Sequence, residues 1–394
     1  MTIPVVYWYL PLPEPVAWPE LTAIALAVPA YARIQSVSIM VKQFKWSSRI
    51  AATMDDLFDA MKVLQPPTIQ RDEERRNRLE TTEVVTVLEL AVEFPRNVDL
   101  TENAISDAFD LGLAGIQDLQ RAYALATQHP IELLTRELLP PMVPTTTRIV
   151  TDRSDGWPGA VGIFLANSVG ISALALPEPL TEQQNAAFRF AFEAPDTPFA
   201  TYADLRRESA AALRLRGDSR SSTLASATAA EVFLDTLLLH LLWEEGSTAE
   251  AAARLFTTSI ARRVRSQYAQ RLGGIWNCMD ATTPPGAWLE LTANVRNRLI
   301  HAGVRPTRAD AETAYRATIH LERYAADLLC GPTRLPRYSR TALALVGDPG
   351  LIRRGVQSAT IAAYRRDEED ADWGAEFTNW RSIVAAERLV IQNS

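Results

Sequence analysis

The chain has 394 residues, of which 47% are apolar, and its formal net charge at pH 7 is −7. This length allows two or three domains with sizeable cores, and the acidic balance argues against wholesale electrostatic binding of nucleic acid. Two cysteines, Cys278 and Cys330, exclude a disulfide framework and a zinc site built on cysteines. The amino terminus has no basic segment of the signal-peptide type, and no run of about 18 apolar residues predicts a membrane span. We therefore expect a cytoplasmic protein.

Residues 1–177 predict a mixed N-terminal domain that contains both strands and helices. Strands are expected at residues 5–10, 34–41, 82–94, 145–151 and 161–173. Helices are expected at 53–63 and at 101–126, where Thr101 is a suitable N-cap. The charged run at 71–78 is typical of a solvated loop or helix face. The sequence of this domain contains no glycine-rich phosphate loop and no cluster of metal-ligating residues.

Residues 178–330 predict a helical bundle. Capping boxes at Thr181–Gln184 and Ser247–Glu250 open two helices, which end near residues 193 and 272. Further helices are expected at residues 202–216, 218–243, 287–302 and 307–330, with a loop over 276–286. Short connections between helices are typical of a bundle. The predicted fold class is therefore α+β, with a strand-containing domain followed by an all-α bundle.

Residues 331–394 predict a helical C-terminal extension. Asp348-Pro349-Gly350 is typical of a turn. Trp373, Phe377 and Trp380 follow at helical spacing, which favours a packed amphipathic helix over a free tail.

One short stretch, residues 291–303, carries the candidate chemistry. Its apolar residues repeat at helical spacing, and Gly303 stands where a left-handed C-cap is expected. Arg296 supplies a forked cation for phosphate, and His301 supplies a group that titrates near neutrality. The helix C-terminus favours a charged imidazolium. Asn297 lies four residues before His301 and shares its face, whereas Arg296 lies about 140° away around the helix. One copy of this helix therefore cannot easily close Arg296 and His301 on one small atom.

The charge of the chain is uneven around this stretch. Residues 1–199 carry 15 basic and 25 acidic side chains, whereas residues 200–330 carry 16 basic and 14 acidic side chains. The segment that holds Arg296 and His301 is thus free of the acidic excess that precedes it. Every basic residue in this segment is an arginine. A general bias of the whole chain against lysine accounts for this without a functional reason, because the chain has only three lysines.

The ordered set Arg296-Asn297-x-x-x-His301, late in the fourth helix of a bundle, resembles the R-x4-6-H signature of the HEPN superfamily. The resemblance covers roughly residues 200–330. It implies an all-helical domain that dimerises, so that two such motifs face each other in one cleft. It also implies metal-independent endoribonuclease activity in toxin–antitoxin and abortive-infection systems, with Arg296 and His301 catalytic, Asn297 in support, and no cofactor or metal.

A carboxylate in the long helix 218–243 is a further candidate. Glu231 lies beside apolar residues, where a buried carboxylate needs a partner, and family members often carry a polar residue here that contacts the motif arginine. A surface role for Glu231 stays open, and Asp235, one turn on, can take its place. His129, His240 and His320 are interpreted as structural, and both cysteines as core or loop thiols.

Three readings follow. The first is a homodimeric endoribonuclease of a bacterial anti-phage or toxin-type system that cuts single-stranded or tRNA-type substrates at a composite dimer cleft, with tRNA and mRNA as the candidate RNAs. The second is a non-catalytic module that binds a nucleotide or a protein. The third is an effector that its own N-terminal domain holds inactive until a phage component or nucleotide triggers it, so that deleting residues 1–177 raises activity.

Overall fold

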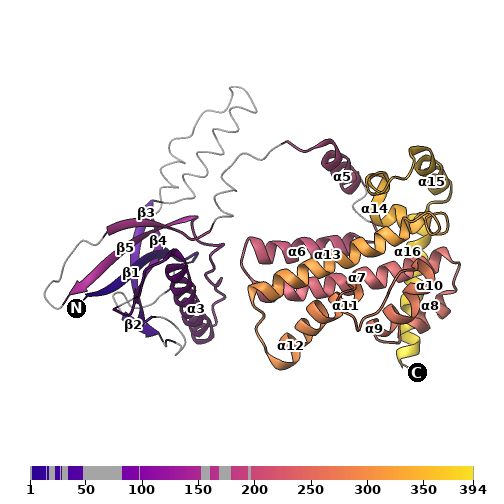
Figure 1. Ribbon diagram of the computed structural model, residues 1–394. Coiled ribbons are helices and arrows are strands. Elements are labelled where there is room, and N and C mark those ends of the chain that lie inside the picture. The colour runs from indigo at the N-terminus through magenta and orange to yellow at the C-terminus, as the bar shows by residue number, and fades with distance from the viewer. Residues whose placement is uncertain are drawn as a thin grey trace. The chain divides into compact units, whose positions relative to one another are not determined.

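The contacts within the chain divide it into two units, Met1–Ala175 and Leu176–Ser394. The computed structural model describes residues 2–14, 16, 23–26, 28, 34–47, 82–96, 98–151, 160–167, 179–193 and 197–393. Within these residues the first unit is an antiparallel sheet with one long helix, and the second is helical (Figure 1). This confirms an α+β chain with a strand-containing N-terminal part and a helical C-terminal part.

The first unit contains a six-stranded sheet in the order β2-β3-β4-β1-β5-β6. All its described neighbours pair antiparallel. The strands are β1 (Thr2–Pro11), β2 (Ala23–Leu26), β3 (Ser36–Ser47), β4 (Thr82–Glu93), β5 (Met142–Thr151) and β6 (Ala160–Leu165). Four predicted strands are confirmed within one to six residues at their ends. The predicted strand 161–173 ends earlier, at Leu165, and the four-residue strand β2 has no counterpart in the predictions.

Helix α3 (Glu102–Thr127) packs on one face of this sheet, as the apolar alternation of the strands requires (Figure 1). Trp8 pairs with Leu90 across β1 and β4, and both are fully buried with Phe109 of the helix. Thr101 is the N-cap, as predicted, and its hydroxyl accepts a hydrogen bond from the Ala104 amide at 3.2 Å. The predicted helix 53–63 and the charged run 71–78 lie outside the described residues.

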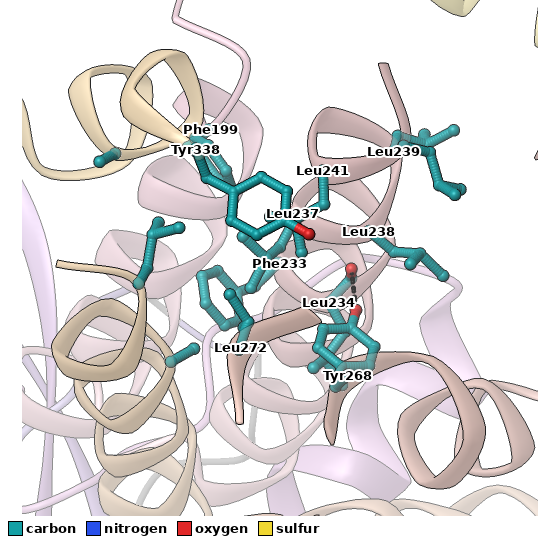
Figure 2. Packing of buried hydrophobic residues seen from close by; sticks show 14 of the residues in the cluster. Phe199, Phe233, Leu234, Leu237, Leu238, Leu239, Leu241, Tyr268, Leu272 and Tyr338 are labelled. Atoms are coloured by element: carbon teal, nitrogen blue, oxygen red, sulfur yellow. Dashed lines mark hydrogen bonds between the residues drawn. The ribbon is translucent and has the colours of Figure 1, made fainter. Parts of the chain in front are cut away.

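The second unit is built around α7 (Ser219–Glu244), which packs between α6 (Ala200–Arg214) and α13 (Arg308–Leu329). Figure 2 shows its buried residues, among them Phe233, with the Tyr268 hydroxyl donating to the Leu234 carbonyl. By length and composition α7 is apolar enough to cross a membrane, but 67% of that stretch is buried inside the structure. That is the pattern of a core helix of a soluble protein.

Two predicted helices differ in the structure. The helix expected over 247–272 begins one residue later, at the N-cap Thr248, and is interrupted after Leu255. It comprises α8 (Ala249–Leu255), α9 (Ile260–Arg263), the π-turn η1 (Val264–Tyr268) and α10 (Ala269–Leu272). The helix expected from 287 begins at Pro284, because proline suits the first helical position, where its missing N–H is not needed. It comprises α11 (Pro284–Trp288), the π-turn η2 (Leu289–Ala293) and α12 (Asn294–Ala302).

The remaining helices are α5 (Glu182–Glu193), α14 (Ser339–Arg353), α15 (Ser358–Ala371) and α16 (Trp373–Asn393). The last three belong to the same unit as the bundle, and α16 packs along α8 and α7. Trp373 and Phe377 are buried there, which confirms a packed helix in place of a free tail. The expected turn at Asp348–Gly350 is instead a kink within α14, where Gly347 has φ +59°.

Candidate functional site on helix α12

Helix α12 presents the predicted motif on the surface of the helical unit. Val295 and Leu299 are buried against the bundle, whereas Asn297 and His301 are exposed and Arg296 is half-buried. Gly303 ends the helix in the left-handed conformation, with φ +65°, as predicted. Open space surrounds the position of a Cβ at Gly303, so backbone conformation, and not crowding, is the reason for glycine.

Asn297 interacts with Arg296. The Arg296 Nη1 donates to the Asn297 Oδ1 at 3.1 Å, so the amide holds one arm of the guanidinium. Within the part of the chain that the structure describes, the imidazole of His301 makes no hydrogen bond or ion pair, and the Asn297 side chain makes none with it. The structure therefore places Arg296 and Asn297 together, with the imidazole of His301 free to meet solvent or a ligand.

Glu231 stands behind this pair on α7. It is half-buried, and burial raises the pKa of the Glu231 carboxyl, while the positive charge of Arg296 lowers it and Asp235 raises it. Glu231 forms no hydrogen bond or ion pair with a residue of the described ranges, so its interaction with Arg296 is one of charge across a gap. Glu231 is therefore neither fully exposed nor hydrogen-bonded to Arg296.

Asp235 serves a different arginine. Its Oδ1 lies 2.5 Å from Nη2 of Arg263, the last residue of α9, and the Arg263 side chain is only 8% exposed. Burial raises the pKa of the Asp235 carboxyl, and the hydrogen bond from Arg263 opposes that rise. The structure thus separates the two candidates: Asp235 pairs with Arg263, and Glu231 is left to face Arg296. Nothing in the sequence around Arg263 indicates this role, because the two residues are 28 positions apart.

The other candidate side chains lie elsewhere. His240 is buried in the core, where its Nδ1 lies 3.0 Å from the Thr341 hydroxyl, and burial lowers its pKa to about 3, which confirms a structural role. His129 and His320 are exposed. Both cysteines are buried and unpaired, and burial raises the pKa of Cys330 to about 11, which leaves a poor nucleophile.

Two clefts in the described part of the helical unit lie away from the motif. They measure about 950 and 570 Å³ and are lined by residues of α5, α14 and α15 and by residues around Glu245 and Arg271, respectively, and neither is lined by α12. No group of three or more His, Cys, Asp or Glu side chains in the described ranges is placed to hold a metal ion. The site therefore consists of the exposed imidazole of His301, the half-buried guanidinium of Arg296, and the Glu231 carboxylate, whose charge interacts with that guanidinium.

Comparison with known proteins adds no further assignment. No protein-family model, curated protein or solved structure matches this chain.

Proposed function

We propose that this chain is a HEPN-type endoribonuclease that cleaves single-stranded RNA without a metal ion. The single observation that carries the proposal is the surface end of α12, where His301 is exposed and Arg296 is half-buried in front of Glu231. A guanidinium in that position is oriented by its neighbours yet keeps donors for a phosphate. The resemblance of the motif to the HEPN signature supports the same reading.

The chemistry assigns a role to each side chain. The ribose 2′-hydroxyl attacks the adjacent phosphorus, the bond to the 5′-oxygen breaks, and a 2′,3′-cyclic phosphate and a free 5′-hydroxyl result. His301 transfers a proton as general base or general acid, and Arg296 stabilises the negative charge that develops on the phosphorane oxygens. Asn297 accepts a hydrogen bond from one nitrogen of the Arg296 guanidinium, and the negative charge of Glu231 helps to orient that guanidinium.

We further propose that the working form is a homodimer through the bundle. Arg296 and His301 lie about 140° apart around α12, so a second copy of the helix supplies the facing groups. Ile300 and Val304, on either side of His301 in the sequence, are 49% and 50% exposed. Apolar side chains next to a functional group are suited to burial against another copy. Light scattering is expected to give twice the mass of the chain, and a monomeric mass for the active protein would contradict this part.

The test is cleavage of a labelled single-stranded RNA in EDTA by the full-length chain. Arg296→Ala and His301→Ala are each expected to lower the rate by about 10² or more, the size of a lost general acid–base contribution. His320→Ala is the matched control, because His320 is an exposed histidine of the same unit on α13.

Two outcomes would contradict the proposal. Unchanged cleavage by the Arg296→Ala, His301→Ala double variant would show that another site, or a contaminant, cuts the RNA. RNA or nucleotide binding without any cleavage by the wild-type chain would favour the non-catalytic module. If expression is toxic to bacteria, the same variants are expected to relieve that toxicity, as a defence or toxin-type nuclease requires.

A further inference from the structure

Three arginines from distant parts of the sequence lie along the acidic pair of α7. Glu231 interacts with the charges of Arg296 and Arg263, and Asp235 with those of Arg263 and Arg388. The arginines come from α12, α9 and α16. Arg263 is ion-paired with Asp235, one helical turn from Glu231, so Arg263 and Arg388 belong to a row of positive charge along this face of α7, which Arg296 continues beside Glu231.

The ring of Phe256 fixes the far end of this row. The guanidinium carbon of Arg263 lies 4.8 Å from the ring centroid, and that of Arg388 lies 5.1 Å from the same centroid. Phe256 is the C-cap of α8, along which α16 packs, so its place and that of Arg388 are set by the helix packing. An arginine side chain stacked on a ring keeps its in-plane N–H groups directed away from the ring face.

The two outer arginines have unused donors, whereas the central one does not face solvent. Arg263 is buried, and it donates to Asp235 and to the Thr258 carbonyl. Arg388 is half-buried and forms no hydrogen bond or ion pair with a residue of the described ranges, and Arg296 donates only to Asn297 there. Three guanidinium groups against two carboxylates leave an excess of one positive charge even when both acids are ionised. A partly desolvated arginine without a counter-ion is costly unless an anion completes it.

We propose that Arg388 binds a second phosphate of the RNA strand that is held at Arg296, so that the C-terminal helix α16 forms part of the substrate site. This inference rests on the proposed function. Arg388 is a positioning residue: it fixes the path of the strand along α7 and takes no part in proton transfer at His301. The forked donor face of arginine suits a phosphodiester.

The experiment measures binding in a chain that cannot cut. A fluorescent single-stranded RNA of about 12 nucleotides is titrated with the full-length His301→Ala chain at several salt concentrations. Adding Arg388→Ala is expected to raise the Kd about tenfold, which corresponds to about 1.4 kcal/mol. The slope of log K against log salt is expected to shrink by about 0.7, the loss of one phosphate contact with a single strand.

Arg381 provides the matched control, because it is an exposed arginine on the same helix, two turns before Arg388, and its replacement changes the net charge equally. Arg381→Ala is expected to change the Kd less than twofold. In the cutting-competent chain, Arg388→Ala is expected to raise KM with kcat nearly unchanged, the signature of lost uniform binding. If Arg388→Ala lowers the melting temperature, Arg388→Gln keeps the stem packed on Phe256 and replaces it in all assays.

The outcomes separate this inference from the function on which it rests. If the His301→Ala parent binds RNA and the Arg388 variants match Arg381→Ala in Kd and salt slope, then Arg388 only supports the fold and the inference is wrong. If Arg388→Gln lowers kcat as strongly as His301→Ala does, the residue is not a positioning residue. If the parent chain neither binds nor cuts RNA, the proposed function itself has failed.

Discussion

Lowering the pH from 7 to 5 is expected to destabilise the helical unit through His240. The imidazole is stacked at 4.3 Å from Phe377 of α16, with Thr341 of α14 at its Nδ1, so it ties both C-terminal helices to α7. Burial, with a smaller contribution from the charge of Arg340, lowers its pKa from 6.5 to about 3. The native chain therefore keeps His240 neutral where the unfolded chain protonates it, which favours unfolding as the pH falls from about 6.5 toward 3.

The size of this effect follows from the two pKa values. At one pKa unit per 1.36 kcal/mol, the unfolded state gains about 2 kcal/mol at pH 5 and about 4 to 5 kcal/mol near pH 3, and almost nothing above pH 7.5. His240 therefore leaves the free energy of unfolding unchanged above about pH 7.5 and lowers it progressively as the pH falls through 6.5 toward 3. The half-buried carboxylates whose pKa burial raises, such as Glu244, act in the opposite direction, so the comparison must be made against a variant.

His240→Gln is that variant, because a glutamine keeps a polar group for Thr341 but does not titrate. Urea unfolding at pH 7 and pH 5, followed by circular dichroism and by the fluorescence of Trp243 beside His240, gives the free energies. The wild-type chain is expected to lose about 2 kcal/mol more than His240→Gln between these pH values. His320→Gln, an exposed histidine, should behave as wild type. Equal pH dependence of wild type and His240→Gln would refute a buried neutral imidazole in the native chain.

Two further changes test the packing. Gly112→Ala places a Cβ 2.4 Å from a methyl group of a buried leucine in β4, so overpacking is expected to cost the first unit about 1–2 kcal/mol in urea unfolding. Gly162→Ala, whose Cβ meets its nearest atom at 3.4 Å, should cost nothing measurable, and equal losses would contradict the clash. Asp235→Asn leaves the buried Arg263 without its counter-ion and is expected to lower the free energy of unfolding by about 3 kcal/mol, measured by thermal unfolding. Asp204→Asn removes an exposed ion pair and should lower it by less than about 1 kcal/mol. Similar losses for the two variants would refute the buried pairing.

Local patterns predicted most of the elements because their causes are local. The strand at residues 82–93 follows from β-branched residues in alternation, and the cap at Thr101 follows from a side chain that bonds the amide three residues on. The break after Leu255 was beyond such reasoning, because the intervening residues carry no proline or glycine. Both π-turns were equally hidden, since they arise where the tertiary packing of a helix accommodates one extra residue.

The residues of the candidate site also fall into two groups: those that local sequence predicts and those that only tertiary packing brings together. Arg296, Asn297 and His301 lie on one helix, and their spacing alone places them at its surface end. The carboxylate behind Arg296 was ambiguous, because Glu231 and Asp235 lie on one face of α7 and local sequence does not distinguish them. What separates them is Arg263, which reaches Asp235 from another helix. Arg388 is more distant still, and only the packing of α16 on α8 brings it to the same row.

The orientation of Arg296 and His301 relative to Trp288 depends on the number of helical residues between them, which include the π-turn η2. Trp288 at the end of α11 is fully buried and anchors the helix on one side of the turn. Each residue of an α-helix advances the chain by about 100° and 1.5 Å. The π-turn holds one residue more than an ordinary helical turn, so losing one residue between 289 and 293 would restore an ordinary helix and leave the direction of Arg296 and His301 relative to Trp288 nearly unchanged. Losing residue 294 or 295, in the regular helix beyond the turn, would instead rotate Arg296 and His301 by about 100° relative to Trp288 and dismantle the site.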